Sequence, residues 1–252
     1  MSNTRFANQA AIVTGGASGI GFVVAKRLAT EGARVWLLDL KEDALKTAQA
    51  DLKAQGVTVE TVSADITKDA DVQRAMEGVS KTAGRLDILV NCAGIVGPNA
   101  RKTTEVSLKE WEQVIAINLT GSFLVTKYAL IEMQKRNYGR VLLFASISGK
   151  EGNAGMCPYS TSKAGVIGLV KAAGKEFAET GITVNAIAPG VIHTPMVESM
   201  SPAQVEYMTS KIPMKRMGTL DEVAALSCWI VSPESSFNTA FAFDLSGGRA
   251  TY

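Results

Sequence analysis

Seven short apolar runs recur along the chain, and most of the stretches between them have the spacing of amphipathic helices. Their hydrophobicity is continuous rather than alternating, which is typical of strands covered on both faces. Strands joined by helical crossovers pair in parallel, so the sequence predicts an α/β fold: a doubly wound, seven-stranded parallel sheet of the Rossmann type with helices on both faces. The predicted strands are Ala10 to Thr14, Arg34 to Asp39, Val57 to Ser63, Asp87 to Asn91, Gly139 to Ala145, Ile182 to Ile187 and Ala240 to Asp244.

The 252 residues contain no internal repeat, low-complexity tract or linker, so we expect a single domain over residues 1–252. Residues 194–218 break the rhythm, because they hold three prolines, five methionines and no strand pattern. We interpret this segment as a mobile substrate lid, in which the methionines pack the lid or line a substrate wall. The predicted helices are Gly19 to Thr30, Lys41 to Ala54, Asp69 to Thr82, Leu108 to Lys135, Pro158 to Glu179 and Leu220 to Ser232.

Composition excludes several classes of protein. The chain has 26 Lys plus Arg against 24 Asp plus Glu, with both signs scattered, so no nucleic-acid partner is expected. Its three cysteines are widely spaced and lack a histidine cluster, which argues against a disulfide framework and a metal site. The first nine residues are polar, and no apolar run approaches the ~20 residues that cross a bilayer. We therefore expect a cytoplasmic protein without a membrane partner.

The first predicted strand runs into a glycine-rich turn, Gly15-Gly16-Ala17-Ser18-Gly19-Ile20-Gly21, followed by a helix. Glycines in such a turn allow backbone N–H groups to reach a pyrophosphate, and the positive end of the helix stabilises its charge. The alternative is a tight strand-to-helix turn that binds nothing.

Asp39 ends the second predicted strand, 18 residues after Gly21. A carboxylate at this point of a dinucleotide-binding unit accepts hydrogen bonds from the adenosine ribose and repels a 2′-phosphate. No Arg or Lys occurs from Thr14 to Phe22 to neutralise such a phosphate, so the sequence predicts NAD rather than NADP. As alternatives, Asp39 could be a solvated strand end or a cap for the next helix.

Tyr159 and Lys163 are i,i+4 neighbours on one predicted helix. Half-ionising a tyrosine near pH 7 requires a pKa shift of about three units, or roughly 4 kcal/mol, and a nearby ammonium has the right sign. Ser146 ends the fifth strand thirteen residues before Tyr159. Ser148 is an alternative hydroxyl, but that separation and the position of Gly149 favour Ser146.

These motifs together resemble the short-chain dehydrogenase/reductase family, in its subgroup of undivided chains of this length. The likeness covers nearly the whole chain. One position departs from it: Cys92 stands where the family most often has a second Asn, which we interpret as a packing change or an oxidisable position. The matching residues are Thr14 to Gly21, Asp65, Asn91-Cys92-Ala93-Gly94, Asn118, Ser146, Tyr159 to Lys163, Asn185, Pro189-Gly190 and Thr194.

The resemblance implies a catalytic group of four residues and NAD as cofactor. Tyr159 would be the general acid/base and Ser146 would hydrogen-bond the substrate oxygen. Lys163 would lower the tyrosine pKa and hold the nicotinamide ribose, and Asn118 would continue a proton relay through water. The implied cofactor-binding residues are Gly15, Ser18, Gly19, Ile20, Gly21, Asp39, Asp65, Ile66, Asn91, Ala93, Gly94, Tyr159, Lys163, Pro189, Gly190, Ile192 and Thr194.

For the small-molecule substrate, the stretch from Gly149 to Asn153 and the tail from Gly247 to Tyr252 resemble NAD-linked members that act on sugars or acid sugars. Polar groups such as Glu151, Asn153 and Arg249 would suit a polyhydroxylated or carboxylate substrate. Our hypothesis is oxidation of a secondary alcohol of a sugar or a 2-keto-3-deoxy sugar acid.

Two other functions remain open. Reduction of a 3-oxoacyl thioester on an acyl carrier protein is one, although Asp39 counts against an NADPH-preferring enzyme. A non-catalytic NAD-binding scaffold is the other, although it would be expected to lose Ser146, Tyr159 or Lys163.

The single histidine, His193, is interpreted as a loop residue rather than a base. The two longest predicted helices carry apolar and small residues on several faces, so we expect them to pair across a two-fold axis in a homotetramer.

Overall fold

The computed structural model describes residues 4–194 and 202–252. Its seven strands form one parallel sheet in the order β3-β2-β1-β4-β5-β6-β7, which confirms the predicted fold class. The third strand is shorter than predicted, and the last begins two residues later. The strands are β1 (Ala10–Thr14), β2 (Arg34–Asp39), β3 (Glu60–Ser63), β4 (Ile88–Asn91), β5 (Gly139–Phe144), β6 (Ile182–Pro189) and β7 (Ala242–Leu245).

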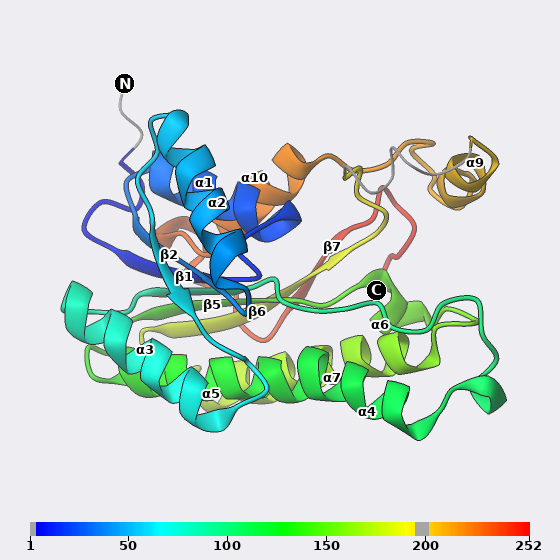
Figure 1. Cartoon of the computed structure of the whole chain (residues 1–252), viewed down its shortest axis with the longest axis horizontal. Helices are drawn as coiled ribbons and strands as arrows, with labels where there is room; N and C mark the ends of the chain where they lie inside the picture. The colour runs from blue at the N-terminus through cyan, green and yellow to red at the C-terminus, as the bar shows by residue number, and fades with distance from the viewer. Residues whose placement is uncertain (1–3, 195–201) are drawn as a thin grey trace.

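Helices cover both faces of the sheet (Figure 1), with α1, α2 and α10 on one side and α3, α5 and α7 on the other. The sequence did not predict α6 and α9. The helices are α1 (Gly19–Thr30), α2 (Glu42–Ala54), α3 (Asp69–Ala83), α4 (Leu108–Ile115), α5 (Gly121–Gln134), α6 (Ile147–Glu151), α7 (Cys157–Glu176), α9 (Pro202–Ser210) and α10 (Leu220–Ile230), with short turns η1 (Thr103–Glu105), η2 (Ala116–Thr120) and η3 (Pro233–Ser235).

The core consists of two apolar layers separated by the sheet. Successive side chains of a strand point to opposite faces, so Ile12 packs with the α3, α5 and α7 side while Val13 packs with the α1, α2 and α10 side. Both side chains are fully buried. Each strand thus supplies both layers, which explains why its hydrophobicity is continuous along the sequence.

The long helix predicted from Leu108 to Lys135 is interrupted. It consists of α4, the π-helical turn η2 and α5. By length and composition alone, the stretch Leu108–Gln134 is apolar enough to cross a membrane, a test that the buried core helix of a folded protein also passes. Its apolar character has a structural cause, because 56% of its most apolar window is buried inside the fold.

The strand order reverses between β1 and β4, since the chain runs from β1 outward to β3 and then returns to β4 on the other side of β1. Ligands of open parallel sheets bind outside the carboxyl ends of the strands at such a reversal. Thr14, Asn91 and Phe144 end β1, β4 and β5, and the residues that follow them are therefore expected to form the site.

Candidate active site

The glycine-rich turn fits a diphosphate. A Cβ on Gly21 would lie 2.2 Å from the Gly15 carbonyl oxygen, so only glycine allows α1 to begin this close to β1. Gly19 has φ +54°, and the space where its Cβ would project is open. Ser18 caps α1 without a side-chain hydrogen bond, and the first turn holds no acidic residue. The N-terminus of α1 can therefore receive an anion.

Asp39 lies beside this turn. Its Oδ1 accepts a hydrogen bond from the Leu40 backbone N–H at 2.8 Å, and its Oδ2 lies 3.4 Å from the Ala17 backbone nitrogen, which donates to it. The N-cap residue of α2 is Lys41, so the interpretation of Asp39 as that helix's cap is wrong. The Asp39 carboxylate is thus half-buried and lies next to the glycine-rich turn.

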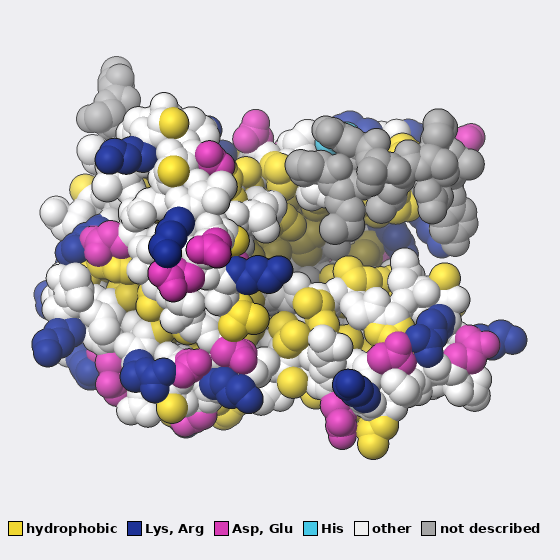
Figure 2. All heavy atoms as spheres, viewed as in Figure 1, with side chains coloured by type: hydrophobic (Ala, Val, Ile, Leu, Met, Phe, Trp, Pro, Cys, Tyr) yellow, Lys and Arg dark blue, Asp and Glu magenta, His cyan; other side chains and the backbone are white. Residues whose placement is uncertain are grey.

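A cavity of about 340 Å³ opens at the carboxyl ends of the strands and holds Ser146, Tyr159 and Lys163 together. Figure 2 shows that the molecule is hollowed between its two helix layers and that hydrophobic side chains are visible in the hollow. The cavity is lined by Ile20, Cys92, Gly94, Ile95, Val96, Phe144, Ala145, Ser146, Tyr159, Lys163, Pro189, Gly190, Ile192 and Thr194.

Ser146 is the hydroxyl that faces this cavity. It is the N-cap of α6, and its Oγ accepts a hydrogen bond from the Ser148 backbone N–H at 3.1 Å. A second hydrogen bond links the Ser146 and Tyr159 side chains. Ser148 does not line the cavity, and its own Oγ accepts a hydrogen bond from Asn153 Nδ2. The geometry therefore favours Ser146 over Ser148.

Lys163 is buried in α7 and donates from Nζ to the Phe144 carbonyl oxygen at 2.6 Å. Burial lowers the Lys163 pKa to about 8, because the charged ammonium loses hydration. Burial raises the Tyr159 pKa, and the bond with Ser146 only partly opposes this. This direction differs from the expectation for a tyrosine beside an ammonium. The reason is geometric: Lys163 Nζ lies 5.7 Å from the centroid of the Tyr159 ring and is bonded to the β5 carbonyl instead.

The lowered Lys163 pKa predicts a pH-dependent stability. The ordinary lysine pKa is 10.5, so between about pH 8 and pH 10.5 the unfolded chain binds more protons than the folded chain. Stability from this group therefore rises with pH across that window, by about 3 kcal/mol in total. We expect the free energy of unfolding of the wild type to rise by this amount relative to Lys163→Met. Urea unfolding of both proteins across the window measures it, and parallel pH profiles would contradict the burial of a lysine charge.

Asn118 lies in the π-helical turn η2 and is fully buried. Its Oδ1 accepts from the Ile95 N–H at 2.8 Å, and its Nδ2 donates to the Ile95 carbonyl at 2.8 Å and to Ser162 Oγ at 3.1 Å. These bonds hold the loop after β4 against α7. The interruption of the long helix thus coincides with the residue that ties two walls of the cavity together.

Four of the predicted cofactor-binding residues make hydrogen bonds or packing contacts with other residues of the chain. Asn91 accepts from Thr14 Oγ1 at 2.5 Å and donates to Ser122, while the Ala93 N–H donates to Thr14. Asp65 accepts from the N–H and hydroxyl of Thr67, and these bonds lower the Asp65 pKa. Ile66 is 7% exposed and packs in the core. None of these four residues lines the cavity.

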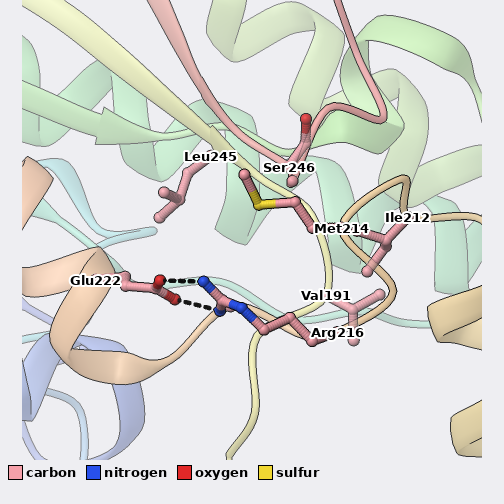
Figure 3. A pocket seen from close by; sticks show the side chains of 9 residues that line it. Val191, Ile212, Met214, Arg216, Glu222, Leu245 and Ser246 are labelled. Carbon is pink, nitrogen blue, oxygen red and sulfur yellow. Dashed lines mark hydrogen bonds and ion pairs between the residues drawn. The ribbon is translucent and has the colours of Figure 1, made fainter.

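The last residue of the predicted lid, Gly218, is hydrogen-bonded to the segment after β6. Residues 195–201 lie outside the described residues, and α9 follows them at Pro202–Ser210. Gly218 then exchanges backbone hydrogen bonds with Val191 and His193. Figure 3 shows Arg216 pointing toward Glu222 across a small pocket of about 60 Å³, and the two guanidinium–carboxylate contacts measure 2.6 and 3.0 Å.

Sequence reasoning missed several residues of the cavity wall, namely Ile95, Val96, Phe144 and Ala145, and assigned Cys92 only to packing or oxidation. Their position directly after β4 or at the end of β5 was the available signal, since parallel strands present their carboxyl ends at one edge.

The Cys92 pKa is raised by burial, so its thiol is not activated. His193 is exposed in its loop, as interpreted from the sequence. Within residues 4–194 and 202–252, no group of His, Cys, Asp or Glu could hold a metal ion.

The fold and the cleft define a dinucleotide-binding oxidoreductase, because a diphosphate turn and a hydroxyl–tyrosine–lysine group meet at one sheet edge. The short chain dehydrogenase family matches residues 9–205, and the chain belongs to this family. A 2-dehydro-3-deoxy-L-rhamnonate dehydrogenase (NAD(+)) from Sphingomonas sp. is 43% identical, with 98% of each chain covered.

Two solved structures are also similar along their whole length. NAD+-bound xylitol dehydrogenase has a TM-score of 0.90 at 30% identity, with 96% of this chain and 99% of that chain covered. A variant of actinorhodin polyketide ketoreductase with NADPH has a TM-score of 0.91 at 36% identity, with 99% of each chain covered.

Proposed function

We propose that the chain is an NAD-dependent dehydrogenase that oxidises a secondary alcohol of a sugar or, preferentially, of a 2-keto-3-deoxy sugar acid. The observation that carries the proposal is the convergence of Ser146, Tyr159 and Lys163 on one cavity beside the Gly15–Gly21 turn. The similar Sphingomonas enzyme, which is named for a 2-dehydro-3-deoxy sugar acid and NAD(+), supports this substrate class.

Each site residue has a role in this reaction. The Ser146 hydroxyl donates a hydrogen bond to the substrate oxygen, and Tyr159 accepts the proton of the alcohol as a phenolate. Positive charge on Lys163 would stabilise that phenolate, and the same ammonium would hold the nicotinamide ribose when the cofactor is bound. Asn118 carries the relay onward to water. The bound nicotinamide supplies the hydride acceptor.

The cofactor lies across the reversal of strand order. The Gly15–Gly21 turn with Ser18 holds the diphosphate, and Asp39 binds the adenosine ribose. Asp65 and Ile66 lie near the adenine, and the backbone from Asn91 to Gly94 lies near the ribose. Pro189, Gly190, Ile192 and Thr194 hold the carboxamide end.

A substrate panel tests the function. Purified protein is incubated with NAD and a series of 2-keto-3-deoxy sugar acids, neutral polyols and 3-hydroxyacyl thioesters, and NADH formation is followed by absorbance. We expect the highest kcat/KM among the sugar acids. A parallel assay supplies 3-oxoacyl thioesters and NADPH and follows NADPH consumption. Turnover confined to that assay would instead support a 3-oxoacyl reductase, the weaker alternative that the 36%-identical ketoreductase represents. Specific binding of NADH without any turnover would support a non-catalytic scaffold.

For assembly, we propose a cytoplasmic homotetramer. Leu108 at the start of α4 and Phe123 and Ile131 on α5 are large apolar side chains that remain exposed at 69%, 48% and 44%. A second copy would cover this face if the long helices pair across a two-fold axis. Light scattering after size-exclusion chromatography should give four times the 26.6 kDa mass of one chain, and a monomer would contradict the assembly.

A further inference from the structure

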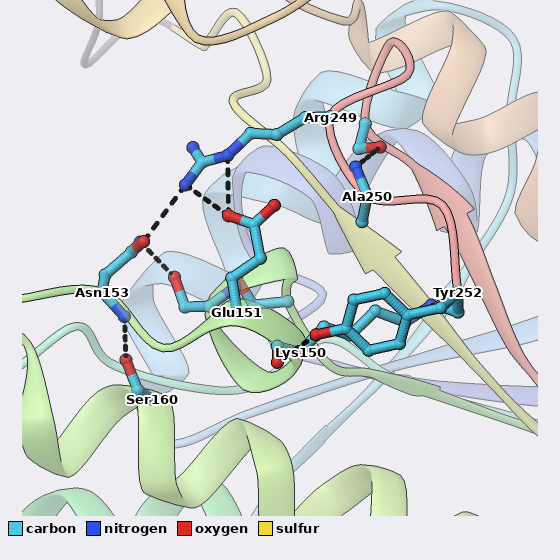
Figure 4. A network of polar contacts seen from close by, with 10 residues as sticks. Lys150, Glu151, Asn153, Ser160, Arg249, Ala250 and Tyr252 are labelled. Carbon is cyan, nitrogen blue, oxygen red and sulfur yellow. Dashed lines mark hydrogen bonds and ion pairs between the residues drawn. The ribbon is translucent and has the colours of Figure 1, made fainter.

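A chain of polar contacts connects the C-terminal tail, residues 246–252, with the segment that follows Ser146 (Figure 4). Arg249 donates from Nε and Nη2 to Glu151 Oε2, at 3.0 and 2.8 Å, and from Nη2 to Asn153 Oδ1 at 3.1 Å. The Arg249 side chain is 13% exposed and the Glu151 side chain 28%, so the guanidinium is mostly buried while its carboxylate partner remains partly in water. Such partly buried, charge-assisted bonds hold their partners in a fixed geometry.

Asn153 lies at the junction of three elements. Its Nδ2 donates to Ser148 Oγ at 2.6 Å, and its backbone N–H donates to Ser160 Oγ at 3.1 Å. Ser148 in turn donates its N–H to Ser146 Oγ at 3.1 Å, while Ser160 follows Tyr159 directly in α7. Asn153 therefore connects the tail with Ser148, which bonds Ser146, and with Ser160, which follows Tyr159.

The tail is itself held by hydrogen bonds within it and to the segment before Gly218. Ser246 Oγ accepts from the Ala250 N–H at 3.1 Å, and the Gly247 carbonyl accepts from the Met214 N–H at 3.2 Å, at the base of the predicted lid. Arg249 thus extends toward Asn153 from a fixed backbone.

The element that carries Ser146 needs such support. Helix α6 has five residues, which is too short to be stable alone. It packs directly on α7, where a Cβ on Gly149 would lie 2.6 Å from the Lys163 carbonyl carbon. Packing fixes the distance between the two helices, while Arg249 holds Glu151 at the C-terminal end of α6 and Asn153 holds Ser148 in its first turn.

We propose that Asn153 and Arg249 are positioning residues, which fix α6 and thereby aim the Ser146 hydroxyl at the substrate oxygen. Neither residue lines the cavity, so neither is assigned a contact with the reacting atoms. The inference rests on the proposed function in one respect, namely that Ser146 binds the substrate oxygen.

Kinetics of matched variants test the proposal. We expect Arg249→Gln and Asn153→Ala each to lower kcat about tenfold, since a small misplacement of a catalytic group costs at least this much. The double variant should lose little more than either single variant, because the same chain of contacts is broken. Asn153→Asp should retain most of kcat, since a carboxylate accepts from both Arg249 and the Ser148 hydroxyl. Arg34→Gln, which breaks the Glu60 ion pair at the opposite edge of the sheet, is the control and should change nothing.

A comparison of substrates separates positioning from direct binding. If Arg249 acts through Ser146, the tenfold loss of kcat should be equal for a sugar acid and for a neutral polyol that the wild type oxidises. A loss confined to the KM of the sugar acid would show that Arg249 binds the substrate carboxylate, and it would overturn the proposal.

Amide hydrogen exchange gives a readout that needs no substrate. The Ser148 N–H that donates to Ser146 should exchange about tenfold faster in Arg249→Gln and in Asn153→Ala than in the wild type. Unchanged protection in both variants would overturn the proposal. A failure of the proposed substrate class would leave this result intact, so the two failures are distinguishable. Melting temperatures show whether each variant is folded. Asn153→Ala tests the same chain of contacts as Arg249→Gln without removing a charge.

Discussion

Tyr159→Phe is expected to lower kcat by about 10³-fold, because general acid/base catalysis contributes roughly 10²- to 10⁴-fold and the variant loses the phenol that accepts the proton. The variant keeps the ring that fills the cavity wall, so the dissociation constant of NADH should change less than twofold. Steady-state kinetics measure the first quantity, and NADH fluorescence titration measures the second.

A second tyrosine provides the control for this experiment. Tyr128 lies on α5, donates from its hydroxyl to Asp69 at 2.8 Å and does not line the cavity. Tyr128→Phe also removes one phenolic oxygen, and it should retain kcat. Full turnover in Tyr159→Phe would refute the role of the phenol as proton acceptor, whatever the substrate is.

Asp39→Ser is expected to lower the ratio of kcat/KM for NAD to that for NADP by about 10²-fold. The substitution removes charge-assisted hydrogen bonds to the ribose, worth about 1.5–3 kcal/mol each, and it also removes the repulsion of a 2′-phosphate. Initial rates with both cofactors at limiting concentrations give the ratio.

A control must show that the change in cofactor ratio comes from the position of Asp39 and not merely from the loss of one negative charge. Asp51→Ser removes the same charge from the exposed side of α2 and should leave the cofactor ratio unchanged. A wild type that already prefers NADP, or an Asp39→Ser variant with an unchanged ratio, would contradict the assignment of Asp39 to the ribose.

The sequence was sufficient where a feature depends on local pattern. The strands around Ile12 and Val13, the glycine turn and the i,i+4 spacing of Tyr159 and Lys163 all follow from residues close together in the chain. Asp39 could be placed beside the turn because parallel strands end at a common edge.

Features that depend on contacts distant in sequence could not be predicted. Arg249 meets Glu151 across 98 residues, and no spacing rule connects them. Burial raises the Tyr159 pKa, and the Lys163 ammonium is hydrogen-bonded to the Phe144 carbonyl; both features depend on how α7 packs in the fold. The interruption at Asn118 was missed because a π turn leaves the apolar composition of a helix unchanged.

That π turn also sets the rotational phase of the helix after it. A π turn holds one residue more than an α-helical turn, and one residue corresponds to about 100° of rotation. Deleting a single residue between 116 and 120 would preserve a continuous helix but rotate α5 by that angle, so that each side chain would take the direction of its predecessor. Lys127 would then point where the buried Thr126 now points, and Phe123 where the buried Ser122 now points. The length of this one turn therefore determines which side chains of α5 enter the core and which remain exposed.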